Sequence, residues 1–524
     1  MLLPVLLLAL VELSLRVFGY GHDTQLFIRY PDDPRYCVMN KYASERYFSD
    51  TANETRGFVE PFLKNKPAGT FRIFVLGEST TAGYPYFHNG SFHRWLKFRL
   101  MHEHPGLHFE IINVSLTAVN SYTVLDFGRQ VLDYQPDAIL VYAGHNEYYG
   151  ALGVGSTSHI ANSRWLVMTI LALRRSRLVQ LLGRLWSELR GQSGTPDQRE
   201  NLMQRMAADQ QIVFGSPAYL AGIRQFRDNM RELCRVTSTR GVPVFLSTVV
   251  SNEKDLKPFS GGSREYALGD SAYRAGAFDL ARRYYVQARE IDALRFRAPM
   301  AIDSVIVQLA GAYPNVHLVD ALGRFEEASP HGIVGKETML EHVHPNLYGY
   351  ALLSDAFCQA IARAHLFARP AADTLAFDSL LVKMPVTAMD SLNGAYTIMM
   401  LRSRWPFNEP IPADFKRGNS VPEQLAGGVA VGRITWLQAM QELYAYSMRV
   451  GDKPTASKVA EALYLDRPLN TRYALYAGRL KFELGDTAGA LFYFKQAYAA
   501  DPSGTNLQSL NLLYMKMGRR VDRP

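Results

Sequence analysis

The sequence predicts an α/β protein with a doubly wound, flavodoxin-like parallel sheet, followed by an all-α C-terminal region. Three observations lead to this prediction. Short apolar runs recur between residues 70 and 369, the segments between them are long enough for crossover helices, and the C-terminal part repeats at a fixed period. With 48% apolar residues over 524 positions, the chain can bury more than one core, so we expect two to four domains.

Five apolar runs are the expected strands of the sheet. They are "RIFVLG" at 72–77, "FEIINVS" at 109–115, "AILVYAG" at 138–144, "VPVFLSTVV" at 242–250 and "NVHLVDA" at 315–321. Parallel strands that alternate with helices all end at one edge of the sheet, which is where such folds bind ligands. Candidate functional residues are therefore expected in the loops that follow these runs.

Two helical insertions interrupt the alternation of strands and helices, at 151–241 and 263–295. The first contains "RWLVMTILALRRSRLVQLLGRLW" (164–186), in which apolar residues dominate and arginines recur. This pattern is typical of a lid, of a helix on a membrane surface, or of a helix packed on its own domain, and the sequence leaves the three open. The second insertion has the small and aromatic residues of a helical pair.

The C-terminal part, 437–524, repeats with a period of 34 residues. The recurring set is Gly451, Ala456, Leu463 and Pro468, which returns as Gly485, Ala490, Ala497 and Pro502. Such a period indicates a helix–turn–helix repeat, whose small residues let two helices approach closely. The pattern resembles the tetratricopeptide repeat, which implies a surface for a protein partner; bracing of the preceding domain is the alternative. Residues 370–436 are predicted to be a connecting region with a few helices.

The first twenty residues are strongly apolar, and Glu12 and Arg16 are their only charged side chains. A membrane-spanning helix needs about 20 apolar residues, and a secretory signal begins with a basic region that is missing here. We expect residues 1–20 to be part of a membrane anchor or the remnant of a signal, with a helix docked on the protein as the alternative. Residues 21–69 are expected to be an N-terminal extension.

Charge and cysteine content exclude few functions. The net charge of +8 favours an anionic surface only weakly, and we do not expect a nucleic-acid partner. The three cysteines, Cys37, Cys234 and Cys358, are far apart and form no CxxC pair. Neither a zinc cluster nor a disulfide framework is indicated.

The first apolar run ends in "GESTTAG", which places Ser79 directly after a strand. A serine hydroxyl is a weak nucleophile at neutral pH, so catalysis requires a base within hydrogen-bond distance and donors for the oxyanion that forms. Gly77 relieves crowding at a sharp turn from strand to helix. Taken alone, a serine in this place is more often a helix N-cap than a catalytic group.

The loop after the third run, "YAGHNEYYG" (142–150), contains a second candidate. Asn146 can offer its side-chain NH₂ group to an oxyanion, and Gly144 allows close approach of the backbone. The loop after the second run lies at the same edge, so its backbone amides are expected to face the same crevice. These residues are therefore candidates for the oxyanion hole.

The segment "LEHVHPNLYGYALLSDAF" (340–357) supplies a candidate base. Glu341 precedes His344 by three residues, so a single turn can bring the carboxylate to the imidazole. The carboxylate would then orient the ring while it takes a proton from Ser79. His342 is the competing base, and Pro345 favours His344 because it makes that position locally rigid.

Together these blocks resemble the SGNH (GDSL) hydrolase family, named for its Ser, Gly, Asn and His residues. Ser79 in "GEST" matches the nucleophile block, Asn146 in "GHNE" the Gly-x-Asn-Asp block, and His344 with Glu341 the Asp-x-x-His block. The resemblance covers roughly 70–150 and 240–365. It implies a Ser–His–acid esterase whose oxyanion hole is formed by the Ser79 amide, an amide of the second block and the Asn146 side chain, with Gly144 beside it.

The sequence departs from the family pattern in four places. Glu78 and Glu147 stand where the family usually has Asp, and Glu341 replaces the usual Asp of the triad. The glycine of the second block has no counterpart, and counting from Asn113 places Ala118 there. An alanine amide donates equally well if its φ permits. Ala118 is therefore predicted to complete the oxyanion hole.

The resemblance implies a serine ester hydrolase that works through an acyl-enzyme, without a metal or an organic cofactor. The apolar N-terminus and the repeats suggest acyl or acetyl esters of glycans or lipids at the cell envelope, with the protein membrane-anchored and facing the periplasm or exterior. A protein partner and membrane association are expected. Two alternatives stay open: an O-acyltransferase that uses the same residues, and a non-catalytic scaffold that binds partners through its repeats.

Overall fold

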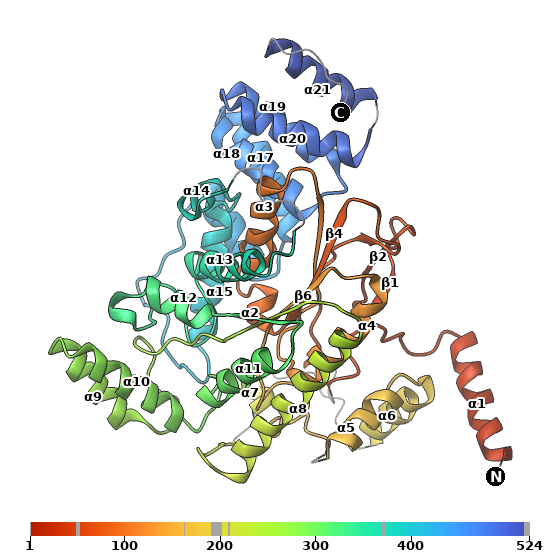
Figure 1. Cartoon of the computed structure of the whole chain (residues 1–524), viewed down its shortest axis with the longest axis vertical. Coiled ribbons are helices and arrows are strands. Elements are labelled where there is room, and N and C mark those ends of the chain that lie inside the picture. The colour runs from red at the N-terminus through yellow and green to blue at the C-terminus, as the bar shows by residue number, and fades with distance from the viewer. Residues whose placement is uncertain are drawn as a thin grey trace. The chain divides into compact units, whose positions relative to one another are not determined.

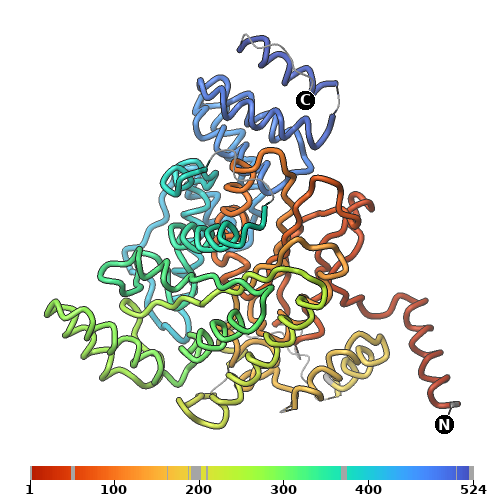
Figure 2. The backbone as a smooth tube through the Cα atoms, in the orientation of Figure 1, coloured from red at the N-terminus to blue at the C-terminus, as the bar shows by residue number. Residues whose placement is uncertain are grey.

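The computed structural model describes residues 2–48, 53–161, 163–189, 202–207, 210–367, 374–502 and 504–517. Figure 2 traces the backbone of the chain, which divides into two compact units. Unit 1 consists of Met1–Tyr84, Arg99–Thr374 and Leu401–Glu409, and unit 2 of Pro85–Phe98, Leu375–Met400 and Pro410–Pro524. Each unit is thus assembled from segments that are separated in the sequence.

A five-stranded parallel sheet forms the core of unit 1 (Figure 1). Its strands are β4 (Thr70–Gly77), β5 (His108–Asn113), β6 (Ala138–Tyr142), β7 (Val244–Ser247) and β8 (Val316–Val319). They lie in the order β5-β4-β6-β7-β8, which is the doubly wound 2-1-3-4-5 arrangement of flavodoxin-like sheets. The predicted parallel α/β sheet is confirmed, and each of the five apolar runs overlaps one strand, although β4 and β5 begin two residues and one residue before their runs.

The strands at the centre of the sheet are buried on both faces. All five residues of β6 are buried, as are the last six of β4. A strand that is covered on both faces has a continuous run of apolar residues, whereas a strand covered on one face alternates apolar and polar residues. The continuous runs made these strands easy to recognise in the sequence. The register pairs Gly77 with Tyr142, so β4 and β6 end side by side.

Long helices cover the two faces of the sheet (Figure 1). On one face α8 packs between α4 and α11, and α13 packs on β7 and β8. These helices are α4 (Ser121–Val131), α8 (Pro217–Thr239), α11 (Met300–Ala312) and α13 (Leu347–Arg363). Polar N-caps begin three of them: the side chains of Asn120, Ser216 and Asn346 each accept a backbone N–H of the first turn.

The first predicted insertion, 151–241, therefore ends in a crossover helix of the sheet, because α8 lies within it. Before α8 come three shorter helices, α5 (Arg164–Leu173), α6 (Arg177–Leu189) and α7 (Leu202–Ala207). The second insertion forms the helical pair α9 (Ser263–Arg274) and α10 (Phe278–Ile291), which pack on each other. Residues 162, 190–201 and 208–209 of the first insertion lie outside the described residues.

The N-terminal region adds a small sheet that the sequence did not predict. Strands β1 (Phe27–Arg29), β2 (Tyr36–Met39) and β3 (Phe62–Leu63) pair antiparallel. They have two to four residues each, which is too short for a recognisable alternation of side chains. Before them lies α1 (Leu2–Val17), and no helix among the described residues is long and apolar enough to cross a membrane.

The remaining helices and turns lie between these elements. They are the helices α2 (Ser79–Ala82), α3 (Phe92–Glu103) and α12 (Ala321–Ala328), with the 3₁₀ turns η2 (His88–Gly90), η3 (Leu132–Tyr134) and η4 (Pro330–Gly332). Of them, η2 and the residues of α3 up to Phe98 belong to unit 2.

Unit 2 is helical. Its helices are α14 (Phe377–Lys383), α15 (Ala388–Arg402, of which the residues to Met400 belong to unit 2), α16 (Val421–Ala430), α17 (Trp436–Val450), α18 (Lys453–Asp466), α19 (Thr471–Glu483), α20 (Thr487–Ala500) and α21 (Gly504–Lys516). From α16 to α21 each helix packs on the next. The 34-residue period has a structural counterpart: Gly451 and Gly485 follow α17 and α19 with φ of 76° and 83°, and Ala456 and Ala490 are fully buried.

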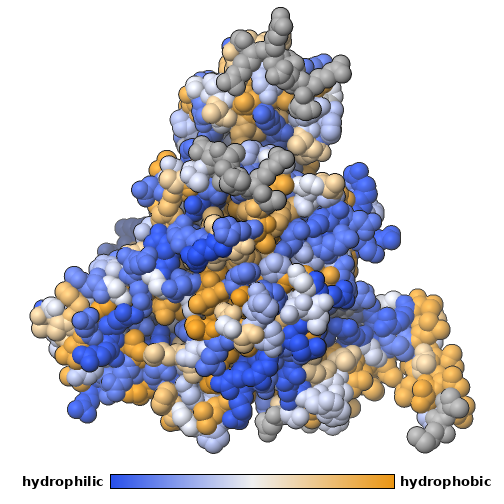
Figure 3. Space-filling view, viewed as in Figure 1, coloured by the Kyte–Doolittle hydropathy of each residue, from blue (hydrophilic) through white to orange (hydrophobic). Residues whose placement is uncertain are grey.

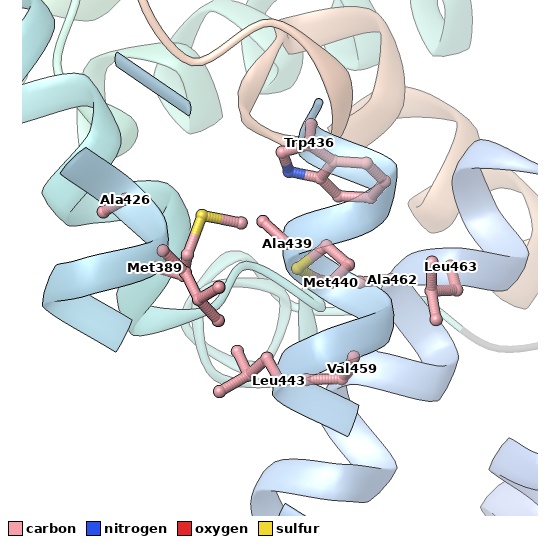
Figure 4. Packing of buried hydrophobic residues seen from close by; sticks show 10 residues of the cluster. Met389, Ala426, Trp436, Ala439, Met440, Leu443, Val459, Ala462 and Leu463 are labelled. Carbon is pink, nitrogen blue, oxygen red and sulfur yellow. The ribbon is translucent and has the colours of Figure 1, made fainter. Parts of the chain in front are cut away.

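Apolar side chains from four helices form the core of unit 2 (Figure 4). Met389, Ala426, Met440 and Leu463 are buried there. The indole of Trp436 joins them and donates a hydrogen bond to Asp390 at 2.6 Å. The buried polar atom of the largest side chain is thus satisfied inside the cluster.

The segment Pro85–Phe98 follows Ser79 closely in the chain and belongs to unit 2. The His88 ring stacks on Trp436 with centroids 4.3 Å apart, and its Nδ1 lies 2.9 Å from Asp466. Asn89 donates to the carbonyl of Ala462 at 2.8 Å. Helices α17 and α18 therefore hold the chain just beyond the serine turn.

A buried arginine links the pieces of unit 1 around β4. Arg72 is fully buried, and its Nε donates to Glu110 on β5 at 2.6 Å. Its other nitrogens donate to the carbonyls of Tyr134 and Leu63 at 2.7 and 2.6 Å. One side chain thus joins the sheet to the turn η3 and to strand β3.

Replacing Arg72 by Met is expected to lower the free energy of unfolding by about 3–5 kcal/mol, because it leaves Glu110 buried without its ion-pair partner. Urea denaturation measures the loss. The matched control is Arg235→Met, which removes an exposed pair with Glu232 at 2.8 Å and should cost less than about 1 kcal/mol. A loss at Arg72 no larger than that of the control would contradict the role given to this side chain.

Candidate active site

The serine turn is fixed by the close approach of β4 and β6. A Cβ atom at Gly77 would lie 2.2 Å from the carbonyl oxygen of Tyr142, so this position requires glycine. The hydroxyl of Thr81 donates to the same carbonyl at 2.5 Å. Thr80 and Thr81 are buried whereas Ser79 is half-buried, so Ser79 is the hydroxyl of the turn that solvent reaches.

The structure brings His344 to Ser79. The Ser79 Oγ and the His344 Nε2 are 2.8 Å apart, which is hydrogen-bond distance. His344 lies in the loop before α13, where the Leu340 amide donates to its carbonyl at 2.9 Å and the Asn346 amide donates to Thr338 at 3.0 Å. Residues that are 265 positions apart therefore meet at the carboxyl edge of the sheet.

Glu341 lies behind the imidazole, as the spacing of three residues predicted. Its carboxylate is buried, and each oxygen accepts one backbone amide and one imidazole. One oxygen bonds to the amide and Nδ1 of His344, and the other to the amide and Nδ1 of His342. Because Nδ1 of His344 donates to the carboxylate, Nε2 is left to accept the serine proton.

His342, the competing base in the sequence, lies among aromatic side chains, while the serine hydroxyl bonds to His344. Its ring lies edge-on to those of Phe259, Phe296 and Phe407, with centroid distances of 6.0, 6.0 and 5.5 Å. Its Nδ1 is occupied by Glu341. The geometry favours His344 as the base and makes His342 a second donor to the carboxylate.

Burial keeps the imidazoles of the site neutral. It lowers the pKa of His344 to about 3 and that of His145 to about 3, and it lowers the pKa of His342 well below the ordinary value. Removing a cationic group from water disfavours its charged form. At neutral pH the His344 ring can therefore accept a proton.

The Asn146 loop is clamped to the serine turn by Glu78. The carboxyl oxygens of Glu78 accept the backbone amides of Gly144 and Asn146, both at 3.0 Å. The prediction that Gly144 belongs to the oxyanion hole needs correction, because its amide is already bound to Glu78. Its φ of 147° suits glycine, and a Cβ atom there would lie 2.8 Å from Ile302, so the residue shapes the loop.

Ala118 has a φ of 55°, in the left-handed region where the family pattern has glycine. An alanine there costs about 1–2 kcal/mol, so other contacts must hold the backbone. The Ala118 carbonyl accepts the amide of Ala151 at 2.8 Å, and the neighbouring amide of Gly150 donates to the Asn146 carbonyl at 2.6 Å. The loops that carry Ala118 and Asn146 are thereby fastened to each other.

Three N–H donors at this edge of the sheet have no acceptor among the described residues. They are the backbone amides of Ser79 and Ala118 and the side-chain amide of Asn146. All three residues are half-buried, while most of the residues around them are buried. Unused donors beside a serine and its base are what stabilisation of an oxyanion requires.

The sequence missed the structural use of two acidic residues. Glu147 accepts the hydroxyl of Ser121 at 2.8 Å and the side-chain amide of Gln225 at 2.6 Å, just as Glu78 accepts the 144–146 backbone. Burial raises the pKa of Glu78 to about 8 and that of Glu147 to about 7. The only sequence signal was position, because each glutamate stands next to a motif residue.

The sequence also missed the contribution of residues 401–409, which were predicted to be part of a connecting region. Arg402 donates to the carbonyl of Leu340 at 3.2 Å, and Phe407 packs on His342. The amide of Asn252 donates to the His342 carbonyl at 2.9 Å. These contacts hold the loop of Glu341 and His344, and nothing local in the sequence indicates them.

One group of potential metal ligands is found in the part of the chain that the structure describes. The ligand atoms of Glu341, His342 and His344 lie within 4.8 Å of one another. Both Nδ1 atoms bond to Glu341, and Nε2 of His344 bonds to Ser79. With these atoms already bonded to protein groups, the cluster fits a proton relay better than a metal centre.

Comparisons with known proteins do not assign a family. No family model and no curated protein matches the chain. Among solved structures, an acetyl xylan esterase matches with 14% identity over 56% of this chain and 100% of its own, at a TM-score of 0.30. A GDSL-like lipase from Bacteroides thetaiotaomicron matches with 12% identity over 58% of this chain and 93% of its own, at a TM-score of 0.29. An acetylxylan esterase from Geobacillus stearothermophilus matches with 14% identity over 57% of this chain and 96% of its own, at a TM-score of 0.29. Likenesses this weak carry no argument about activity, which depends on the side-chain geometry above.

The neutral state of His344 predicts a pH dependence of stability. The unfolded chain protonates this imidazole below about pH 6.5, while the folded state resists protonation down to about pH 3. Its contribution to stability is therefore present above pH 6.5 and is lost as the pH falls. Between pH 7 and pH 5 the protein should lose about 2 kcal/mol more unfolding free energy than the His344→Gln variant does. Denaturant titrations at both pH values measure this, with the exposed His365→Gln as control; equal losses in all three proteins would contradict the burial effect.

Proposed function

We propose that the protein is a serine ester hydrolase of the SGNH type. The observation that carries the proposal is the 2.8 Å contact between the Ser79 Oγ and the His344 Nε2, with the Glu341 carboxylate on the other nitrogen of the same ring. A hydroxyl, a neutral imidazole and an orienting carboxylate in line are the parts of an activated nucleophile. Acyl transfer also requires N–H donors that stabilise the oxyanion, and the unused donors of Ser79, Ala118 and Asn146 supply them.

The reaction then runs in two steps. Ser79 attacks the ester carbonyl carbon while its proton passes to His344, and the three donors bind the oxyanion of the tetrahedral intermediate. His344 returns the proton to the leaving alcohol as the C–O bond breaks, which leaves an acyl-enzyme on Ser79. Water attacks this ester in the same way, releases the carboxylic acid and restores the serine.

The proposed substrates are acyl or acetyl esters of glycans or lipids at the cell envelope. The apolar helix α1 and the helical repeats support this context. An O-acyltransferase would use the same acyl-enzyme and differ only in the acceptor hydroxyl. We also propose that α17–α20 are repeats of the tetratricopeptide type that bind a protein partner, supported by the equivalent glycines and buried alanines one period apart.

Replacement of Ser79 by Ala should reduce the turnover of p-nitrophenyl acetate by at least about 10³-fold, because the nucleophile is lost. Turnover and thermal unfolding are measured on the same samples. Thr80→Ser, which keeps a hydroxyl on the neighbouring residue, should retain activity within a few fold. A fluorophosphonate probe should label the protein once and fail to label Ser79→Ala.

His344→Gln and His342→Gln form a matched pair within this experiment. Both imidazoles bond to Glu341, but only His344 reaches Ser79. His344→Gln should lose as much activity as Ser79→Ala, whereas His342→Gln should keep most of it. Equal turnover by the wild-type protein and Ser79→Ala would end the hydrolase proposal and leave the scaffold alternative. Transfer of the acetyl group to an added oligosaccharide in preference to water would favour the acyltransferase.

Replacement of Asn146 by Ala should lower kcat by about 10²–10³-fold with little change in KM, because the lost donor acts mainly in the transition state. Steady-state kinetics with p-nitrophenyl acetate separate the two constants. Thr117→Ala, a half-buried neighbour in the loop of Ala118, is the control and should remain near wild-type activity. A kcat for Asn146→Ala within threefold of wild type would remove this residue from the oxyanion hole.

A further inference from the structure

Helix α6 exposes a continuous apolar stripe. Leu182, Leu185, Trp186 and Leu189 follow the spacing of one helical face, and their side chains are 56%, 46%, 58% and 83% exposed. Helix α5 adds Trp165, which is 75% exposed, and the exposed Leu166 and Leu173. Exposed apolar side chains gathered in this way on a folded protein indicate a surface that binds something.

Helix α1 is attached to the same place. The carboxylate of Glu12 accepts the hydroxyl of Ser176 at 2.7 Å and the amides of Arg177 and Leu178 at 3.1 and 2.9 Å, so it caps the start of α6. Leucines are exposed around most of α1, which appears as an orange rod in Figure 3. A helix that is apolar nearly all round requires an apolar environment. We call the exposed side chains of these three helices the α1–α5–α6 face.

The charges beside this face are predominantly positive. Residues 163–189 contain five arginines and one glutamate. Arg16, Arg175 and Arg184 have side chains that are 53%, 50% and 70% exposed. Each of these three arginines pairs with a carboxylate, Arg16 with Glu12, Arg175 with Asp126 and Arg184 with Glu188, so the positive excess comes from the larger number of arginines in the segment.

We propose that the α1–α5–α6 face binds the surface of an anionic phospholipid bilayer. Leucines and a tryptophan on one side of α6, with Arg184 on the opposite side, are the composition of helices that lie in the interface of a membrane. Arginines attract anionic headgroups while the apolar side chains enter the acyl boundary. A second copy of the chain is a poorer partner for this face, because it would bring two arginine-rich surfaces together. The inference is independent of the proposed ester hydrolysis.

Flotation with lipid vesicles tests the proposal on the full chain. Vesicles with 30 mol% phosphatidylglycerol in phosphatidylcholine should carry the protein, and pure phosphatidylcholine should bind it at least tenfold more weakly. Vesicles of brominated lipid should quench the fluorescence of Trp165 and Trp186. Leu185→Glu combined with Trp186→Glu should reduce binding at least tenfold, and Arg184→Gln about fivefold, on anionic vesicles only.

The matched control is Val307→Glu, an exposed apolar residue on α11 that is 50% exposed, which should bind as wild type does. Circular dichroism and p-nitrophenyl acetate turnover show whether each variant is folded. If the double variant does not fold, vesicle binding is measured with Trp186→Ala and Arg184→Gln instead. Absence of binding to anionic vesicles, or equal binding of the α6 variants and the control, overturns the proposal. Sedimentation that shows a dimer dissociated by the α6 variants, without vesicle binding, assigns the face to a second copy instead.

Discussion

The Glu341 carboxylate, buried between two imidazoles, is the interaction on which the candidate site depends. A buried carboxylate is costly unless its oxygens are bonded, and here two amides and two imidazoles bond them. Four donors from two residues, His342 and His344, converge on this carboxylate, which fixes the loop from 340 to 346. Arg402 and the amide of Asn252 then hold that loop from outside. The orientation of the His344 ring follows from this packing, because its Nδ1 bonds to the Glu341 carboxylate.

The buried acids and imidazoles of the site act on stability in opposite directions. The raised pKa values of Glu78 and Glu147, about 8 and 7, mean that the folded state holds these protons longer than the unfolded chain does. Their contribution is full below about pH 4.5 and is lost as the pH rises. The neutral histidines contribute above about pH 6.5 and lose their contribution as the pH falls. Between pH 4.5 and pH 6.5 the losses from the glutamates and from the histidines run in opposite directions with pH and partly cancel. Replacing one of these residues therefore shows its pH dependence more clearly than the unfolding free energy of the wild-type protein does.

The sequence predicted those parts of the fold that depend on local patterns. The strands were recognisable because β4 and β6 are apolar on both faces, and the order of Ser79, Asn146 and His344 along the chain placed them at one edge of the sheet. The sheet of β1 to β3 was missed because its strands are too short to show a pattern. The use of the Gly144 amide by Glu78 and the contact of Phe407 with His342 depend on long-range packing, which no local pattern encodes. For Ala118 the sequence predicted the position, by counting from Asn113. It could not show the positive φ of this residue or the hydrogen bond from Ala151 that holds it.

The insertion after β6 joins the candidate site to the α1–α5–α6 face. Its first residues belong to the site, because the Gly150 and Ala151 amides fasten the loops of Asn146 and Ala118. The amide of Thr157 donates to the Met206 carbonyl at 2.9 Å and ties the next part of the insertion to α7. The exposed side chains of α5 and α6 follow directly. A short strand-to-helix loop could hold the Asn146 turn but would expose no apolar helix, whereas this insertion fastens that turn with its buried start and presents an apolar face with its helices. Under the two proposals made above, one segment of the chain would both support the catalytic site and fix the surface at which that site works.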